Sequence, residues 1–135
     1  MKGQSIIEII IVFGIAFLLL AGLVTGVTLS IKNVQFARNK SQAVKYAQEG
    51  LEIARSLRDQ DWTSFTAKTG ILCLNKAGSW SSGSCVKNID NFFTRSVDFK
   101  WNVTFDQAEV TVIVSWTEGN LTHQSQLVSY LTKWR

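Results

Sequence analysis

A long uncharged stretch near the start of the chain constrains the fold more than any other feature. No Asp, Glu, Lys or Arg occurs between Ile9 and Ile31, and almost every side chain in that interval is aliphatic or aromatic. A helix of about 20 such residues, rising about 1.5 Å per residue, spans the roughly 30 Å hydrocarbon core of a bilayer. The sequence therefore predicts a membrane-spanning helix in this part of the chain.

A single carboxylate stands at the entrance to this stretch. Glu8 directly precedes Ile9, and an ionisable group this close to hydrocarbon is costly unless a counter-charge meets it. An ordinary signal anchor or a secretory signal peptide is the alternative for such a segment. A secretory signal has an apolar core of about 7–15 residues with a small-residue cleavage site after it, and neither property fits this sequence well.

The residues around this carboxylate resemble the processing signal of type IV prepilins. The signal consists of Gly3, the small residue Ser5 and Glu8, followed at once by the apolar helix. The resemblance implies that a prepilin peptidase cuts between Gly3 and Gln4 and then methylates the new amine of Gln4. It also implies that Glu8 pairs with the N-terminal ammonium of a neighbouring subunit, since a carboxylate and an ammonium are each costly to bury alone.

Two features depart from the usual pattern of this family. The family usually has Phe at the position of Gln4, and many members carry a helix-kinking proline, whereas this chain contains no proline. Local softening of the helix is therefore expected at Gly14, Gly22 and Gly26, because each glycine weakens a helix by about 1 kcal/mol relative to Ala.

The periodicity beyond the span predicts that the helix continues. Apolar residues recur there at steps of three and four and share one helix face: Val44, Ala47, Leu51, Ala54 and Leu57. We therefore expect one continuous helix from about Gln4 to Leu57, whose apolar face needs a cover. Gly50 marks either a close approach to that cover or a weak point in the helix.

Alternation of apolar and polar residues predicts strands in the second half of the chain. A short apolar strand is expected at 71–74, and alternating strands are expected at 93–103, 108–116 and 121–132. Because the connections are short, the last three strands should pair as an antiparallel meander. The predicted fold class is α+β, a long N-terminal helix packed on a small antiparallel sheet, and the resemblance implies the same pilin-like architecture.

These elements divide the chain into four segments. The leader peptide is expected at 1–3, the transmembrane or filament-core half of the helix at 4–31, and its amphipathic half at 32–62. An antiparallel β domain with a cysteine loop is expected at 63–135. Roughly one hundred residues after the span suffice for one small core and not for two.

The state of the two cysteines depends on the redox conditions of the compartment in which the second half of the chain lies. Cys73 and Cys85 lie in one glycine- and serine-rich segment. Outside the cytoplasm they are expected to form a disulfide, worth about 3 kcal/mol in the chain-entropy model, whereas in a reducing compartment they stay thiols.

The direction in which the chain crosses the membrane is predicted differently by two arguments. The resemblance places the C-terminal domain outside the cytoplasm. The positive-inside rule places it in the cytoplasm, because more basic residues follow the span than precede it. The basic residues that follow it are Lys32, Arg38, Lys40 and Lys45. We follow the resemblance and expect an exported domain.

Other candidate sites have simpler explanations. Asp59 and Asp61 fit the start of a calcium loop, but a complete site needs six to eight oxygens, and a polar helix exit explains both residues. His123 with Cys73 or Cys85 would form a nucleophile pair, but neither cysteine has a basic neighbour that favours its thiolate. The sequence carries no paired-cysteine metal signature and no phosphate-cradling glycine motif, so we expect a non-enzymatic protein without a cofactor.

Basic and aromatic residues mix in the cysteine loop and near the C-terminus, a combination that binds single-stranded DNA. They are Lys76, Trp80, Lys87, Lys100, Trp101, Lys133, Trp134 and Arg135. Several of these tryptophans fall on the apolar face of strands, where a core position explains them. The net charge of +4 permits contact with lipid or nucleic acid and demands neither.

The sequence is therefore interpreted as a minor pilin or pseudopilin, a structural subunit of a type IV pilus-like or type II secretion-like filament. Its implied partners are a prepilin peptidase, other pilin subunits, an inner-membrane assembly platform, and membrane lipid before assembly. We expect a single-pass membrane protein that becomes part of a periplasmic or cell-surface filament. The alternative is a membrane-anchored protein that never polymerises and whose extracytoplasmic domain binds DNA or a surface ligand.

Overall fold

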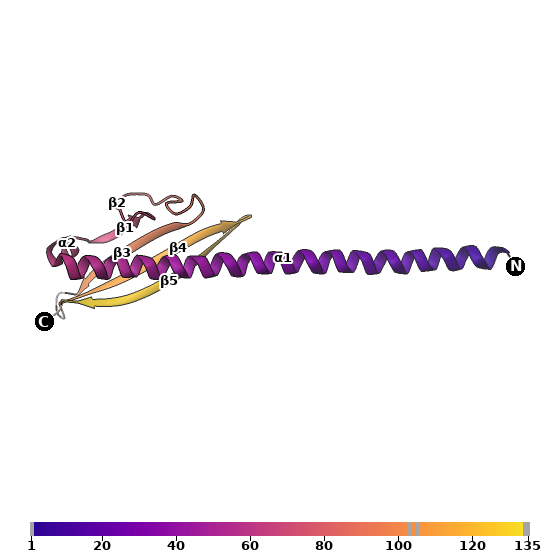
Figure 1. The fold of residues 1–135 in the computed structure, drawn as a ribbon, viewed down its shortest axis with the longest axis horizontal. Helices are drawn as coiled ribbons and strands as arrows, with labels where there is room; N and C mark the ends of the chain where they lie inside the picture. Colours follow the sequence, from indigo (N-terminus) through magenta and orange to yellow (C-terminus); the bar gives the residue numbers. More distant parts are fainter. Residues whose placement is uncertain (1, 103, 105, 134–135) are drawn as a thin grey trace. The chain divides into compact units, whose positions relative to one another are not determined.

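The computed structural model describes residues 2–102, 104 and 106–133 (Figure 1). Its elements in chain order are α1 (Lys2–Gln60), α2 (Trp62–Thr66), β1 (Gly70–Leu74), β2 (Trp80–Ser82), β3 (Thr94–Asn102), β4 (Gln107–Glu118) and β5 (Leu121–Thr132). The chain divides into two compact units, Met1–Arg38 and Asn39–Arg135. The predicted α+β layout, a long apolar N-terminal helix and an antiparallel sheet, is confirmed.

The first unit consists of the N-terminal part of α1. The second unit contains the rest of this helix, which continues to Gln60, slightly beyond the end that the periodicity predicts near Leu57. Within the second unit this part of α1 lies along one face of the sheet (Figure 1). Its buried residues are small or slender: Ala43, Ala47, Gly50, Leu51 and Ala54. The predicted face is therefore correct at its centre, whereas Val44 is half-buried at its margin.

Gly50 lies where α1 comes close to the sheet. A Cβ atom at this position would stand 3.0 Å from Cγ1 of Val112 and 3.2 Å from Cδ of Arg95. Both separations are shorter than an ordinary van der Waals contact, so a Cβ atom here would require the side chains of Val112 and Arg95 to shift by a few tenths of an ångström. Of the two interpretations of Gly50, the close approach is the correct one.

The strands form one antiparallel sheet in the order β2-β1-β3-β4-β5. The predicted meander is present, and its register places Val112 of β4 between Val97 of β3 and Leu127 of β5. Gly119, with φ of +60°, and Asn120 form the two-residue turn between β4 and β5. A glycine with positive φ at the first central position suits the turn types that hairpins favour.

Two elements of the structure were not predicted. Strand β2 pairs with β1 in a segment where the sequence offered little to pack except Trp80. The short helix α2 replaces the expected polar turn, because the side chain of Asp61 accepts a hydrogen bond from the Ser64 N–H at 3.0 Å and caps the helix. The pairing of β2 with β1 and the cap at Asp61 both depend on specific partners, which the periodicity of the sequence does not indicate.

Helix α2 brings an aromatic cluster onto the sheet. Phe65 packs edge-on against Phe99 and Trp101, with ring centroids 5.8 and 5.5 Å apart, and Trp62 meets Trp101 at 5.9 Å. The indole N–H of Trp101 donates to the carbonyl of Lys68 at 3.0 Å. Edge-to-face pairs of this kind stabilise a core beyond the area they bury.

A carboxylate joins the beginning of the second unit to the β4–β5 hairpin. Oε1 of Glu118 accepts hydrogen bonds from Nδ2 of Asn39 at 2.6 Å and from the indole N–H of Trp116 at 3.0 Å. The bond from Asn39, and then that from Trp116, lowers the pKa of the Glu118 carboxyl.

Replacing Gly50 with Ala should lower the free energy of unfolding of the second unit. Alanine normally favours a helix by about 1 kcal/mol over glycine, but crowding against Val112 and Arg95 should reverse the sign and cost about 1–3 kcal/mol. Thermal or urea unfolding of the full chain in detergent measures the change. Gly26→Ala serves as the control, because nothing lies within 4 Å of a Cβ built there. A stabilised Gly50→Ala variant would contradict the expected cost and would show that the side chains of Val112 and Arg95 shift easily.

The Glu118 interaction predicts a specific pH dependence. Because the pKa of Glu118 is lowered on folding, its contribution is present above the unfolded value of about 4.3 and is lost as pH falls through the folded pKa. The melting temperature of the wild type should therefore fall more steeply below about pH 4.3 than that of Glu118→Gln. Glu52→Gln is the control and should keep the wild-type slope. Parallel curves for wild type and Glu118→Gln would refute the interaction.

Candidate functional site

The first unit exposes an apolar surface that requires a cover. Its large aliphatic and aromatic side chains, from Ile6 to Val34, are between 48 and 73 % exposed. By length and composition α1 is able to cross a membrane, and none of the residues in its apolar window is buried. Exposed apolar surface costs about 25 cal/mol per Å² in water, so a surface this continuous marks a contact with lipid or with other apolar helices.

The two threonine hydroxyls within this surface are satisfied by the helix itself. Thr25 donates to the carbonyls of Ala21 at 3.1 Å and Gly22 at 2.9 Å, and Thr28 donates to the carbonyl of Val24 at 2.8 Å. A hydroxyl in hydrocarbon without a partner would cost several kcal/mol. These bonds therefore make the segment compatible with an apolar environment on every side.

Glu8 interrupts the apolar surface near its start. Gly3 and Gln4 lie in the first turns of α1, and Glu8 follows Gln4 by one further turn with its side chain exposed. Among the described side chains, none forms an ion pair with Glu8. In an apolar environment this carboxylate therefore needs a counter-charge from another molecule or from an aqueous interface.

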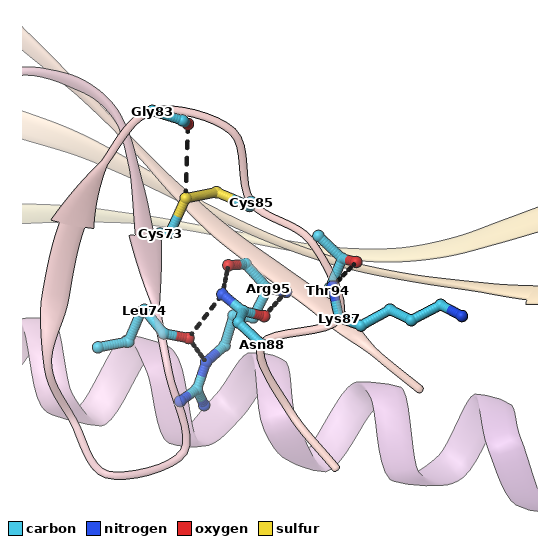
Figure 2. Close-up of a disulfide and its surroundings, with 8 residues drawn as sticks. All are labelled: Cys73, Leu74, Gly83, Cys85, Lys87, Asn88, Thr94 and Arg95. Carbon is cyan, nitrogen blue, oxygen red and sulfur yellow. Dashed lines mark hydrogen bonds between the residues drawn. A yellow bond between two sulfur atoms is a disulfide. The ribbon is translucent and has the colours of Figure 1, made fainter. Parts of the chain in front are cut away.

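The second unit contains the predicted disulfide. Cys73 of β1 and Cys85 are bonded, with their Cα atoms 5.3 Å apart (Figure 2). Sγ of Cys73 lies 3.5 Å from the carbonyl oxygen of Gly83, inside the loop that the bond closes. The disulfide joins β1 to the segment that leads into β3.

A buried guanidinium next to this loop binds three main-chain carbonyls. Arg95 of β3 is fully buried, and its nitrogens donate to the carbonyl oxygens of Leu74 at 3.1 Å, Tyr46 at 3.0 Å and Asn75 at 2.6 Å. Oε1 of Glu49 lies 3.4 Å from the guanidinium. Burial lowers the pKa of Arg95, and the Glu49 carboxylate opposes that shift. One cation thus connects β1, the β1–β2 turn and β3 to α1.

Two further side chains hold the segment after the disulfide. Oδ1 of Asn88 accepts from the Arg95 N–H at 2.7 Å, and its Nδ2 donates to the Arg95 carbonyl at 2.8 Å (Figure 2). Asp90 accepts from Nζ of Lys76 at 2.6 Å and from the hydroxyl of Tyr46. The bond from Lys76, and then that from Tyr46, lowers the pKa of the Asp90 carboxyl.

The role of Arg95 was not predicted, although the sequence contains a signal for it. Arg95 is the one charged residue among the apolar positions of the alternation at 93–103, so its side chain had to point toward the core. A long cation on a buried face needs acceptors. The missing information was the identity of those acceptors, which are main-chain oxygens.

The residues considered for metal binding and nucleophilic catalysis have other roles. Asp61 caps α2, and Asp59 pairs with Arg58 at 2.7 Å. In the part of the chain that the structure describes, no group of three or more His, Cys, Asp and Glu residues is placed to hold a metal ion. His123 stacks on Trp116 with ring centroids 5.5 Å apart, and both cysteine sulfurs are in the disulfide.

Two of the lysines considered for DNA contact lie next to carboxylates. Lys76 pairs with Asp90 at 2.6 Å, and Nζ of Lys100 lies 3.5 Å from the carboxylate of Asp98. The side chain of Lys87 extends away from the disulfide (Figure 2). Two of these three cations are thus already next to a carboxylate.

The two described tryptophans of that set, Trp80 and Trp101, are half-buried against other aromatic rings. Trp101 is part of the aromatic cluster, and Trp80 is half-buried and packs on Phe99 at 5.6 Å. Nζ of Lys133 lies 5.9 Å from the ring centroid of Trp62. The segment Trp134–Arg135 lies outside the described residues. Trp80 and Trp101 therefore have packing roles at the edge of the core.

No family model, no curated protein and no solved structure matches this chain. The function is therefore argued from the residues and geometry described above.

Replacing Arg95 with Met should destabilise the second unit by about 2–4 kcal/mol, because several hydrogen bonds to a buried cation are lost at once. Chemical unfolding of the full chain in detergent measures the loss. Arg55→Met is the matched control, since Arg55 is 40 % exposed in its pair with Glu52, and an exposed pair contributes less than about 1 kcal/mol. Equal losses in the two variants would show that the buried carbonyl contacts contribute nothing.

Proposed function

We propose that this chain is a structural subunit of a type IV pilus-like or type II secretion-like filament. The observation that carries the proposal is a part of the first unit: a helical stretch without charge from Ile9 to Ile31, exposed along its length, with one carboxylate at its entrance. The α+β layout of the whole chain and the resemblance at Gly3 and Glu8 support the same class. The role is structural, and no catalytic residue or cofactor is assigned.

Processing would prepare the helix for assembly. A prepilin peptidase would cleave between Gly3 and Gln4, removing the leader, and would methylate the new amine of Gln4. Cleavage places a positive charge one helical turn from Glu8, in a chain whose next basic residue is Lys32. The mature end of the helix would then carry one charge of each sign next to an apolar surface.

Assembly would bury this surface between subunits. In lipid, helices gain little from apolar burial alone, so close packing and polar pairs drive their association. Glu8 of one subunit would meet the Gln4 ammonium of its neighbour, and each charge would supply the partner that the other lacks. Because the pair is local, it would also set the axial register between neighbouring helices.

The second unit would stay outside the cytoplasm while the helix moves from bilayer to filament. The Cys73–Cys85 disulfide supports an oxidising location, since such bonds persist outside the reducing cytoplasm. The partners in this pathway are the prepilin peptidase, other pilin subunits, an assembly platform in the inner membrane, and lipid before assembly.

The Glu8 pair gives the experiment that tests the proposal. In a host that supplies the peptidase and assembly machinery, Glu8→Gln should be cleaved normally but should yield at least about 100-fold less filament. An unpaired ammonium buried in the filament costs about 3 kcal/mol or more. Sheared filaments are quantified by sedimentation and immunoblotting.

Glu52→Gln is the control, because it removes the same charge from an exposed position of α1 in the second unit. It should assemble at the wild-type level. Normal filament yield from Glu8→Gln would refute the pairing, and absence of filaments from the wild type would favour a membrane-anchored protein that does not polymerise.

A further inference from the structure

A group of basic residues follows the apolar stretch along α1. Between Glu8 and Glu49 the chain contains no acidic residue, and its cations gather in one stretch, the basic segment 32–45. The cations of this segment are Lys32, Arg38, Lys40 and Lys45. All four side chains are exposed, and none forms an ion pair with the described residues.

The length of the apolar stretch places the start of this segment at a membrane surface. From Glu8 to Lys32 the helix rises roughly 36 Å, at about 1.5 Å per residue, against a hydrocarbon core of about 30 Å. If Glu8 lies at one interface, Lys32 therefore lies in the headgroup region of the opposite leaflet. The long stems of lysine and arginine also allow their charged ends to reach the phosphates while the carbons stay near the acyl chains.

We propose that Lys32 and Arg38, the two cations of the basic segment that belong to the first unit, bind the headgroups of anionic phospholipids in the leaflet where the apolar stretch ends. The proposal rests on the membrane insertion described above and is independent of filament assembly. Cations beside a membrane span bind anionic lipid with a gain of about fivefold for each residue near the surface. Lipid explains the segment better than nucleic acid, because binding of single-stranded nucleic acid relies on exposed aromatic rings. The one aromatic residue of the segment, Phe36, is half-buried.

Lipid selectivity in reconstituted vesicles tests this proposal directly. The full chain is placed in vesicles of phosphatidylcholine with a minor share of phosphatidylglycerol, and spin-labelled forms of both lipids report which one lies next to the protein. The wild type should prefer phosphatidylglycerol by at least about fivefold at low salt, the gain expected from one cation at the surface. The preference should weaken strongly in 1 M NaCl, where the Debye length is about 3 Å.

A matched pair of double variants assigns the effect to the segment. Lys32→Gln with Arg38→Gln should bring the preference close to one. Lys87→Gln with Lys100→Gln removes the same charge from exposed positions of the second unit and should leave the preference unchanged. Equal preferences for the wild type and the Lys32/Arg38 variant would overturn the proposal.

Two other outcomes distinguish lipid binding from nucleic-acid binding and from the proposed filament function. If a single-stranded oligonucleotide binds through Lys32 and Arg38 in pure phosphatidylcholine vesicles while the lipid preference is absent, the segment contacts nucleic acid and the proposal is wrong. The assay requires insertion but no peptidase and no assembly. A chain that selects anionic lipid and never forms filaments would therefore contradict the proposed function and leave this inference intact.

Discussion

The apolar side chains of α1 between Ile9 and Ile31 must be covered, and the proposed function depends on that requirement. Between Ile9 and Ile31 the helix satisfies its own backbone, and even its threonine hydroxyls, but its side chains have no partner within the described chain. Water cannot fill that role because the exposed area is too large and too continuous. A bilayer and a bundle of identical helices are the two environments that can. A filament subunit passes from the first to the second, and a single helix suits both.

The second unit is held together by packing within the chain, by the disulfide and by the hydrogen bonds of Arg95. Its sheet needs α1 as a cover, and the close approach at Gly50 brings the two layers together. The loop that closes on Cys73 and Cys85 is then attached to this framework through Arg95, whose guanidinium binds carbonyls from three segments. Covalent and hydrogen-bonded links therefore converge on one region, which keeps an irregular loop ordered without a large core of its own.

Sequence patterns predicted the elements that depend on periodicity and missed those that depend on partners. The uncharged run and the three-four spacing gave α1, and alternation gave β3, β4 and β5. Strand β2 and the role of Arg95 were not predicted, because cross-strand pairing and main-chain acceptors leave no mark on residue type. Gly50 in the sequence indicated that another element could approach the helix closely, but it did not identify Val112 and Arg95 as the neighbours. The proposed partner of Glu8 is likewise not identified by residue type, because it lies in another molecule.

Cleavage at Gly3 tests the central claim most directly. The full chain is co-expressed with a prepilin peptidase, purified from membranes, and its intact mass is determined. The account predicts a chain that begins at Gln4, carries one added methyl group, and lacks two hydrogens because Cys73 and Cys85 are bonded. A mass that begins at Met1 in the presence of active peptidase would contradict the account and identify the protein as a membrane-anchored domain outside the pilin class.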